Sequence, residues 1–495
     1  MPISLPCRPS AAADPIARAR QLDAMRASLR YAYDQPPGIA MAESVPKGHE
    51  YPPEVVLKVV ELGLAMKLNR AAADLEGVTF KSLLHRTPAA TSSSLRSCRA
   101  LFATIGAPAI AAIAPTDPRA DAAFAWQRVA GANPFLLRAI DRLPDNFRVT
   151  AADFTRAIGS ADSLDAARAE GRLFLADWAA LEGIPAGVGD GRNKHLAAPL
   201  ALFVNRLGVG LRPVAIQCAQ TPVAGAAPLT PDDGVAWQIA RAIVQAADCN
   251  LQEIFFHLGR AHFLVEAFAV ATLRQLAPQH PIATLLAPHF EGTLAINDAA
   301  RTKLCVAGGQ METLLAPTRE AALALSRSAI ETFRFDDDRL PNELARRGVA
   351  DASVLADYPF RDDARLIWDA IDAFARAYVA LYYEDDAAVA NDTELAAWVD
   401  EIRSNDGGRV RGFPERIDSR ARLGDALGWL VFTTSAHHAS VNYTQFDWMG
   451  YAPNMPASGY ASAPVAGASL DADAAWAALL PSPSLAAEQV DFFYQ

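Results

Sequence analysis

The sequence predicts a mainly α-helical protein with one large domain, a small β element and a long, buried core helix. Three observations support this prediction. Apolar residues make up 51% of the 495 residues, enough to bury an extensive core. Long stretches repeat apolar residues at helical spacing, whereas only two short segments look like strands.

The helical prediction is clearest for residues 53–68 and 366–383, where apolar residues recur every three or four positions. Alanine, the strongest helix former, is abundant throughout the chain. The two strand candidates are residues 199–205 and 211–219, separated by the turn-like segment 206–210. We expect these two strands to form a small hairpin or sheet beside the helices.

The sequence contains no clear linker between domains. Residues 36–53, 183–193 and 220–233 are rich in residues that break helices, but each segment is short and none is a low-complexity linker. No internal repeat is evident. We therefore predict an N-terminal helical region over residues 1–115, followed by one large helical domain over residues 116–495.

Composition and charge argue against several partners and locations. The net charge of −11 produces a field that repels phosphate backbones, so nucleic acid is not an expected partner. The five scattered cysteines and the lack of a signal-like N-terminus suggest a reducing, cytoplasmic location. No transmembrane segment is expected, because the most apolar window, residues 263–273, is shorter than the roughly 18 residues required and contains Glu266.

The most informative passage begins at His257 and ends at Glu266 on a stretch that is apolar on nearly every side. His257 and His262 are five positions apart, so on a regular helix they point about 140° apart and cannot share one ion. A π-bulge brings such a pair onto one face, and π-bulges occur mostly at functional sites. We therefore predict a π-bulge in the core helix. Glu266, one turn after His262, is either a capping or ion-paired carboxylate or a partner of a ligand.

A second passage carries His438 and Asn442, which are four positions apart. On a regular helix their side chains lie within about 40° of each other, so an imidazole and a carboxamide oxygen can point at the same spot. His437 is rotated away by about 100° and is the poorer candidate.

Three imidazoles and a weak oxygen ligand, without a thiolate, suit a first-row divalent ion. Iron and zinc are both compatible with this set of ligands. Each histidine pair alone also fits a simpler interpretation, in which buried histidines only form hydrogen bonds.

Other motifs carry less information. The glycine-rich residues 187–191 lack the strand-to-helix context of a phosphate-binding loop, so a flexible turn is the better interpretation. The chain contains no G-x-S-x-G elbow, no Walker loop and no H-E-x-x-H motif. Hydrolase and kinase functions therefore lose their main support.

The histidine passages closely resemble the lipoxygenase family. The resemblance runs from His257 through His280 and His289 to Asn297. Further segments resemble the family in the same order, at residues 126–134, 237–240, 357–363, 392–398 and 450–456. The resemblance spans residues 120–495, which would make residues 116–495 a lipoxygenase catalytic core.

The resemblance implies a non-haem iron, Fe²⁺ or Fe³⁺, held by His257, His262, His438 and, more weakly, Asn442. It also implies that the substrates are a polyunsaturated fatty acid and O₂. Hydrogen is removed from the doubly allylic methylene of a cis,cis-1,4-diene, and O₂ adds to the opposite face of the radical. Iron supplies a one-electron step that no side chain can perform, and the protein supplies position and an apolar site.

Two further positions gain a role only from the resemblance. Ala300 matches the position associated with product stereochemistry and resembles the enzymes that make (S)-hydroperoxides. Leu304 resembles the leucine that presses the pentadiene toward the iron. Without the resemblance, ordinary helix packing explains both residues.

The chain also departs from the family pattern. Lipoxygenases usually complete the iron shell with their C-terminal carboxylate, commonly that of isoleucine, whereas this chain ends in Gln495, which we do not assign as a ligand. We expect that the last helices of the family are missing. Ala267 stands where the family often has proline, and no run of short strands suggests an N-terminal lipid-binding β-sandwich.

Two other functions remain open at the level of the sequence. The first is a metal-poor or truncated relative that only binds lipid. The second is a zinc hydrolase with His257, His262 and His438 as ligands and Glu266 as the base. Metal content and the formation of a conjugated diene from linoleate would separate these functions from an iron dioxygenase.

Overall fold

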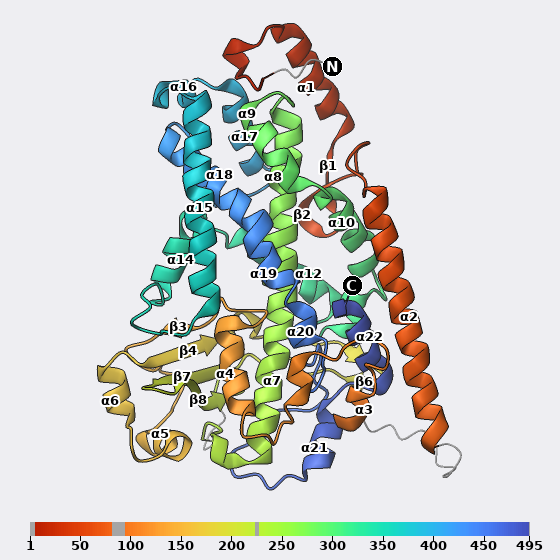
Figure 1. The fold of residues 1–495 in the computed structure, drawn as a ribbon, viewed down its shortest axis with the longest axis vertical. Coiled ribbons are helices and arrows are strands. Elements are labelled where there is room, and N and C mark those ends of the chain that lie inside the picture. Colours follow the sequence, from red (N-terminus) through yellow and green to blue (C-terminus); the bar gives the residue numbers. More distant parts are fainter. Residues whose placement is uncertain (1–4, 82–94, 223–226, 495) are drawn as a thin grey trace.

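The computed structural model describes residues 5–81, 95–222 and 227–494. A continuous helical column runs along the long axis of the molecule (Figure 1). It consists of α7 (Val235–Leu251), the π-helical segment η5 (Gln252–Phe263) and α8 (Leu264–Gln275). Helices surround this column and a small sheet lies beside its lower end (Figure 1). The prediction of a mainly helical fold is confirmed.

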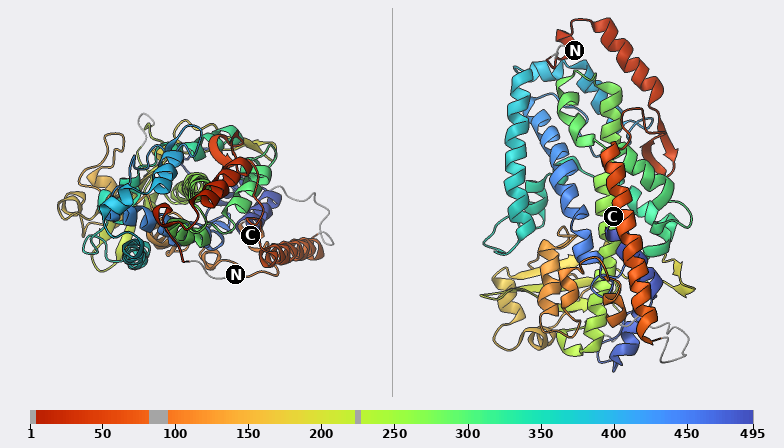
Figure 2. Two further views of the ribbon diagram at one scale, coloured as in Figure 1. Left: turned by 90° about the horizontal axis from the view of Figure 1, so that it is seen from above. Right: turned by 45° about the vertical axis from the view of Figure 1, so that its right-hand side comes forward.

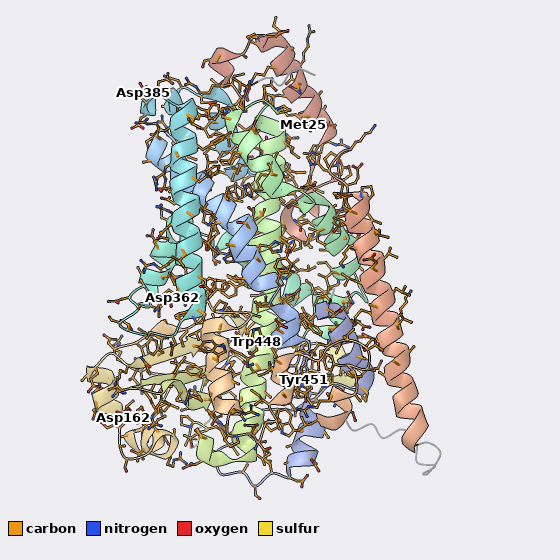
Figure 3. The ribbon with its side chains drawn as sticks, viewed as in Figure 1. Met25, Asp162, Asp362, Asp385, Trp448 and Tyr451 are labelled. Atoms are coloured by element: carbon orange, nitrogen blue, oxygen red, sulfur yellow. The ribbon has the colours of Figure 1, made fainter. Side chains whose placement is uncertain are left out.

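The column is apolar enough over Val235–Gln275 to pass for a membrane span, but 83% of its most apolar window is buried inside the protein. A helix that is apolar on every side is expected in the centre of a large core. A capping box joins Thr230 to Asp233 in the 3-10 turn η4 (Pro231–Asp233), and Gly234, with a positive φ of 59°, separates this turn from the column. Side chains fill the space around the column (Figure 3).

The remaining helices pack around this column or lie outside it. In chain order they are α1 (Pro15–Ser28), α2 (Pro53–Lys81), α3 (Leu95–Arg99), α4 (Ala120–Ala130), α5 (Ala151–Ile158), α6 (Leu164–Ala169), α9 (Pro281–Leu286), α10 (Thr293–Ala299), α11 (Gln310–Leu314), α12 (Arg319–Glu331), α13 (Phe335–Asp338), α14 (Leu340–Arg346), α15 (Pro359–Tyr382), α16 (Asp386–Ala390), α17 (Thr393–Arg403), α18 (Arg420–Phe432), α19 (His438–Asn442), α20 (Gln445–Met449), α21 (Ala472–Leu479) and α22 (Pro483–Tyr494).

Besides short 3-10 helices, the helical part includes two short π-helical segments. One is η7 (Ala300–Leu304), directly after α10, and the other is η8 (Thr433–His437), between α18 and α19. The helix predicted over residues 53–68 lies within α2, and the one predicted over residues 366–383 is confirmed to its last residue but one, because α15 ends at Tyr382.

The main sheet has four antiparallel strands in the order β3-β4-β7-β8. Its strands are β3 (Arg138–Ala139), β4 (Leu173–Asp177), β7 (Leu200–Arg206) and β8 (Gly210–Gln217). The hairpin β7–β8 is the one predicted from the sequence. The short pair β5 (Val188–Gly189) and β6 (Arg192–Asn193) is joined by a turn at residues 190–191, so the glycine-rich segment contains a turn as expected. Asp190 and Gly191 both have positive φ angles there.

The N-terminal region also contains a hairpin that was not among the predicted strands. It consists of β1 (Tyr31–Asp34) and β2 (Pro37–Ala42), and the last four residues of β2 are buried in the main core. By contrast, α2 lies along the outside of the molecule (Figures 1 and 2). Asn69 and Arg70 tie α2 to the body through bonds to Leu101 and Asp491.

Candidate metal centre

Three imidazoles from two separate segments meet inside the molecule. His257 and His262 belong to η5, and His438 is the first residue of α19. Their ligand atoms all lie within 4.8 Å of one another. The Nε2 atom of His262 is 3.1 Å from Nε2 of His257 and 3.1 Å from Nε2 of His438. The structure thus brings together the three histidines that the sequence analysis selected.

The backbone explains how two histidines five positions apart share one face. A π-helix pairs residues i and i+5, so His257 lies directly below His262 on the same side. The π-helical hydrogen bonding covers all 12 residues of η5 and is therefore more extensive than the single predicted bulge. A second π-helical segment, η8, directly precedes His438. Both segments that carry the imidazoles thus depart from regular α-helix.

The opposite ring nitrogens are held by hydrogen bonds. Nδ1 of His257 lies 3.1 Å from a carboxylate oxygen of Glu253, and Nδ1 of His262 lies 2.8 Å from Oδ1 of Asn297. Both oxygens accept, so each Nδ1 carries the proton and each Nε2 presents a lone pair to the cluster. Gln445 donates to the same oxygen of Glu253 and fixes its position.

Burial lowers the pKa of two of the clustered imidazoles. It lowers the pKa of His262 to about 4 and, with the neighbouring imidazoles, the pKa of His438 to about 2. Burial alone would raise the pKa of Glu253, but the contacts with His257 and Gln445 outweigh it and the pKa is lowered. Three imidazole nitrogens therefore face one another beside a buried carboxylate, an arrangement that a bound cation stabilises.

The donor set indicates the class of ion. Three imidazole nitrogens without a thiolate suit a first-row divalent ion. Two of the separations between these nitrogens are 3.1 Å, and all three ligand atoms lie within 4.8 Å of one another.

The other candidate residues lie close by in the fold. Asn442 is half-buried at the end of α19, four residues after His438. Ala300 and Leu304 begin and end η7, and both pack, partly buried, against the main core. Their roles remain predictions. Gln495 lies outside the described residues.

Glu266 lies away from the three imidazoles. Its carboxylate accepts a hydrogen bond of 2.7 Å from the backbone N–H of Ala42 in β2, and no hydrogen bond joins it to any of the three imidazoles in the described part of the chain. These contacts give no support to Glu266 as the base of a zinc hydrolase. The carboxylate beside the cluster is Glu253, which the sequence analysis missed although it stands four residues before His257.

His437 also lies outside the cluster, as predicted. Its ring stacks on Phe135 with 4.9 Å between ring centroids, and burial lowers its pKa to about 4. Its Nε2 atom is buried and has no hydrogen-bond partner in the described part of the protein. His437 therefore belongs to the aromatic surroundings of the site.

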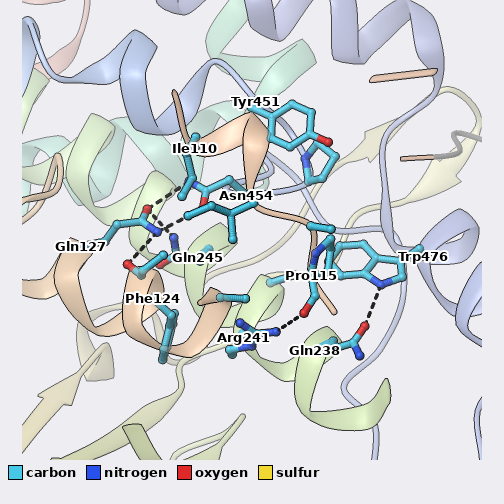
Figure 4. Close-up of a pocket in the computed structure, with 16 residues that line it drawn as sticks. Ile110, Pro115, Phe124, Gln127, Gln238, Arg241, Gln245, Tyr451, Asn454 and Trp476 are labelled. Atoms are coloured by element: carbon cyan, nitrogen blue, oxygen red, sulfur yellow. Dashed lines mark hydrogen bonds between the residues drawn. The ribbon is translucent and has the colours of Figure 1, made fainter. Parts of the chain in front are cut away.

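A small cavity between α4 and the lower part of α7 is unrelated to the cluster (Figure 4). Its volume is about 50 Å³, which accommodates water but no extended ligand. Gln127 bridges Asn454 and Gln245 at its wall, and Arg241 donates to the backbone oxygen of Pro115 (Figure 4). These bonds join α4 and α7 to the loops around them.

Comparison with known proteins gives a consistent result. The family model named Lipoxygenase matches residues 82–483. A linoleate 9/13-lipoxygenase of Pseudomonas aeruginosa is 40% identical over 410 residues, which are 81% of this chain and 59% of the relative. Polyunsaturated fatty acid lipoxygenase ALOX15B of Rattus norvegicus is 36% identical over 79% of this chain and 57% of its own length. The chain thus spans less than two thirds of these curated relatives.

Solved structures agree with these sequence matches. The crystal structure of a lipoxygenase variant in complex with arachidonate has a TM-score of 0.89 and 28% identity, covering 99% of this chain and 74% of the other. Coral 8R-lipoxygenase has a TM-score of 0.85 and 27% identity, covering 99% and 73%. A manganese lipoxygenase shares the fold with a TM-score of 0.77 and 24% identity, covering 99% and 86%.

Proposed function

The chain belongs to the lipoxygenase family, and from this premise we propose that it is a non-haem iron dioxygenase acting on polyunsaturated fatty acids. The observation that carries the proposal is the convergence of three imidazole Nε2 atoms in a buried site. His257, His262, His438 and Asn442 would hold the ion. Bound there, iron supplies a one-electron oxidation and reduction that no side chain provides.

The protein contributes fixed orientation at this site. Glu253 and Asn297 hold the rings of His257 and His262 in the tautomer that presents Nε2. Because both partners are buried, the rings need little reorganisation when the ion is bound. The apolar core around the column also keeps water away from a reactive lipid radical.

The substrate proposal is a fatty acid with a cis,cis-1,4-diene. It is supported by the names of the relatives, one a linoleate lipoxygenase and one a structure with bound arachidonate. We assign the pentadiene to the space beside η7, with Leu304 pressing it toward the ion and Ala300 directing O₂ to give an (S)-hydroperoxide.

Iron is proposed over manganese on the family resemblance alone, since both ions accept imidazole ligands. Elemental analysis of the purified chain, as isolated and after loading with Fe²⁺ or Mn²⁺, separates the two ions. Activity that follows manganese and not iron would contradict the iron assignment.

The activity test compares linoleate with oleate, which lacks the 1,4-diene. We expect conjugated-diene absorbance and O₂ uptake in equal amounts with linoleate and neither with oleate. Chiral chromatography of the product tests the (S) assignment, and Ala300→Gly should shift the product toward the (R) form. Linoleate binding without metal, O₂ uptake or diene formation would instead identify a relative that only binds lipid.

A further inference from the structure

A second cavity lies beside the metal centre and has no place in the proposed reaction. Its volume is about 540 Å³, within the range of about 300–1,000 Å³ that is typical of ligand pockets. It is lined by residues of β3, η5, α13, α14 and η8 and by Phe360 of α15. In Figure 1, α14 and the lower end of α15 lie beside the column, just above β3.

The inner wall of this cavity is aromatic. Phe135 is central to it, with its ring 5.1 Å from that of Phe256, 5.0 Å from that of Phe360 and 4.9 Å from that of His437. Phe255 packs against Phe256 with 5.1 Å between the ring centroids. Such a wall offers a large apolar surface to a hydrocarbon chain.

The cavity touches the back of the metal centre without opening onto it. Phe256 and His437 line it, and they directly precede His257 and His438 in the chain. Among the described residues, none of the three clustered imidazoles lines the cavity, and neither does η7. A molecule bound here therefore occupies a different place from a diene beside η7.

The rim of the cavity is charged, with more basic than acidic side chains. The basic residues are Arg138, Arg260, Arg334, Arg346 and Arg347, and the acidic residues are Asp177, Asp337, Asp338 and Glu343. In a chain whose net charge is −11, an excess of positive charge around one cavity is a local feature.

The pairing of these charges leaves two arginines available. Arg260 is 2.7 Å from Asp338, and Arg347 pairs with Glu343. Arg334 bonds only backbone oxygens, and within the described ranges no carboxylate pairs with Arg334 or Arg346. Both lie near Arg260. Burial lowers the pKa of Arg260, and the positive charges of Arg346 and Arg334 lower it further.

We propose that this cavity binds a long-chain carboxylate as a second ligand, with its chain on the aromatic wall and its carboxylate at Arg334 and Arg346. An apolar wall ending at unpaired guanidinium groups matches a molecule with one long apolar part and one anionic end. Planar guanidinium groups bind carboxylates in two parallel hydrogen bonds, which favours this end group over a neutral one. Binding in this cavity does not require the proposed oxygenase activity.

The test uses the full chain loaded with metal and calorimetric titration with dodecanoate, a saturated acid without a diene. We expect Arg334→Glu combined with Arg346→Glu to weaken binding at the cavity by about tenfold or more. Ala180→Trp, at an exposed position on the cavity wall, should abolish that binding by filling the space. The matched control is Arg20→Glu with Arg416→Glu, two exposed arginines that do not line the cavity.

Dodecanol and dodecyl phosphate distinguish the chemistry of the end group. Binding of dodecanoate that is stronger than that of dodecanol by about tenfold supports carboxylate recognition. Stronger binding of dodecyl phosphate than of dodecanoate would overturn it in favour of a phosphorylated lipid. Unchanged titrations of both the arginine variant and Ala180→Trp, or an equal loss in the control variant, would overturn the site. Dodecanoate bound beside η7 would survive all of these changes, so failure here leaves the proposed oxygenase function untouched.

Discussion

His438 is the clustered imidazole that comes from outside η5, so its removal leaves two ligands on one segment. We predict that His438→Ala lowers the affinity for the ion by well over about tenfold. His437→Phe is the matched control, because it removes the neighbouring imidazole and keeps a ring against Phe135. Metal content after dialysis against a chelator measures both variants. Equal metal loss in both would show that the region, and not the ligand, matters.

Glu253 allows a graded test of ring orientation. Glu253→Gln keeps an oxygen that can accept from Nδ1 of His257, whereas Glu253→Leu removes it. We predict metal dissociation constants raised about tenfold in the first variant and about 100-fold in the second. Competition with a coloured chelator gives these constants. Equal constants for both variants would mean that the carboxylate only fills space.

Some contacts of the site could be predicted from the sequence and others could not. The spacing of His257 and His262 pointed to one face of a helix, because helix geometry is local. The bonds from Asn297 and Gln445 could not be predicted, since each joins residues far apart in the chain. Glu253 could have been found, because it stands four residues before His257 on the same buried segment.

At the scale of elements, η5 packs closely against α12 at Gly259. A Cβ atom at Gly259 would lie 2.6 Å from Cβ of Ala329 and 3.0 Å from the backbone oxygen of Ser326. We predict that Gly259→Ala lowers the free energy of unfolding by about 1–3 kcal/mol through overpacking. Chemical denaturation measures the change.

Two further variants test the cause of that loss. Adding Ala329→Gly should restore part of the stability, because it removes the nearer of the two contacts. Gly63→Ala in α2 has open space around its new methyl group and should stabilise the protein by about 0.5–1 kcal/mol, as expected for an unhindered helix position. Destabilisation by both alanine substitutions would contradict the packing argument.

The same contact explains why the extent of η5 was not predicted. Apolar periodicity located α2, α15 and the hairpin β7–β8, because these elements follow a local pattern. The histidine spacing required one extra residue per turn at a single point. Extension of the π-helical bonds over 12 residues depends on partners such as α12, which periodicity does not reveal.

At the scale of the whole molecule, Glu266 joins the N-terminal hairpin to the central column. Its carboxylate accepts a hydrogen bond from the backbone N–H of Ala42 in β2. Asn297, Asp298 and Arg301 also influence its pKa. The sequence did not predict this hairpin, since strands as short as β1 and β2 resemble loops until they pack. Changing Glu266 therefore tests whether the N-terminal hairpin unfolds together with the core.

Burial is the largest cause that raises the pKa of Glu266, from 4.5 to about 7. The folded state then binds a proton more tightly than the unfolded state. The resulting stability is present in full below pH 4.5 and is lost as the pH rises through 7. We predict that the free energy of unfolding falls by about 3 kcal/mol across this interval, on the scale of 1.36 kcal/mol per pKa unit.

Glu266→Gln keeps an acceptor for Ala42 and removes the titration, so its urea unfolding should depend less on pH between 5 and 8. Glu291→Gln, at an exposed position, should follow the parent chain. Parallel pH profiles for the parent chain and Glu266→Gln would mean that the pKa of Glu266 is not raised in the folded core.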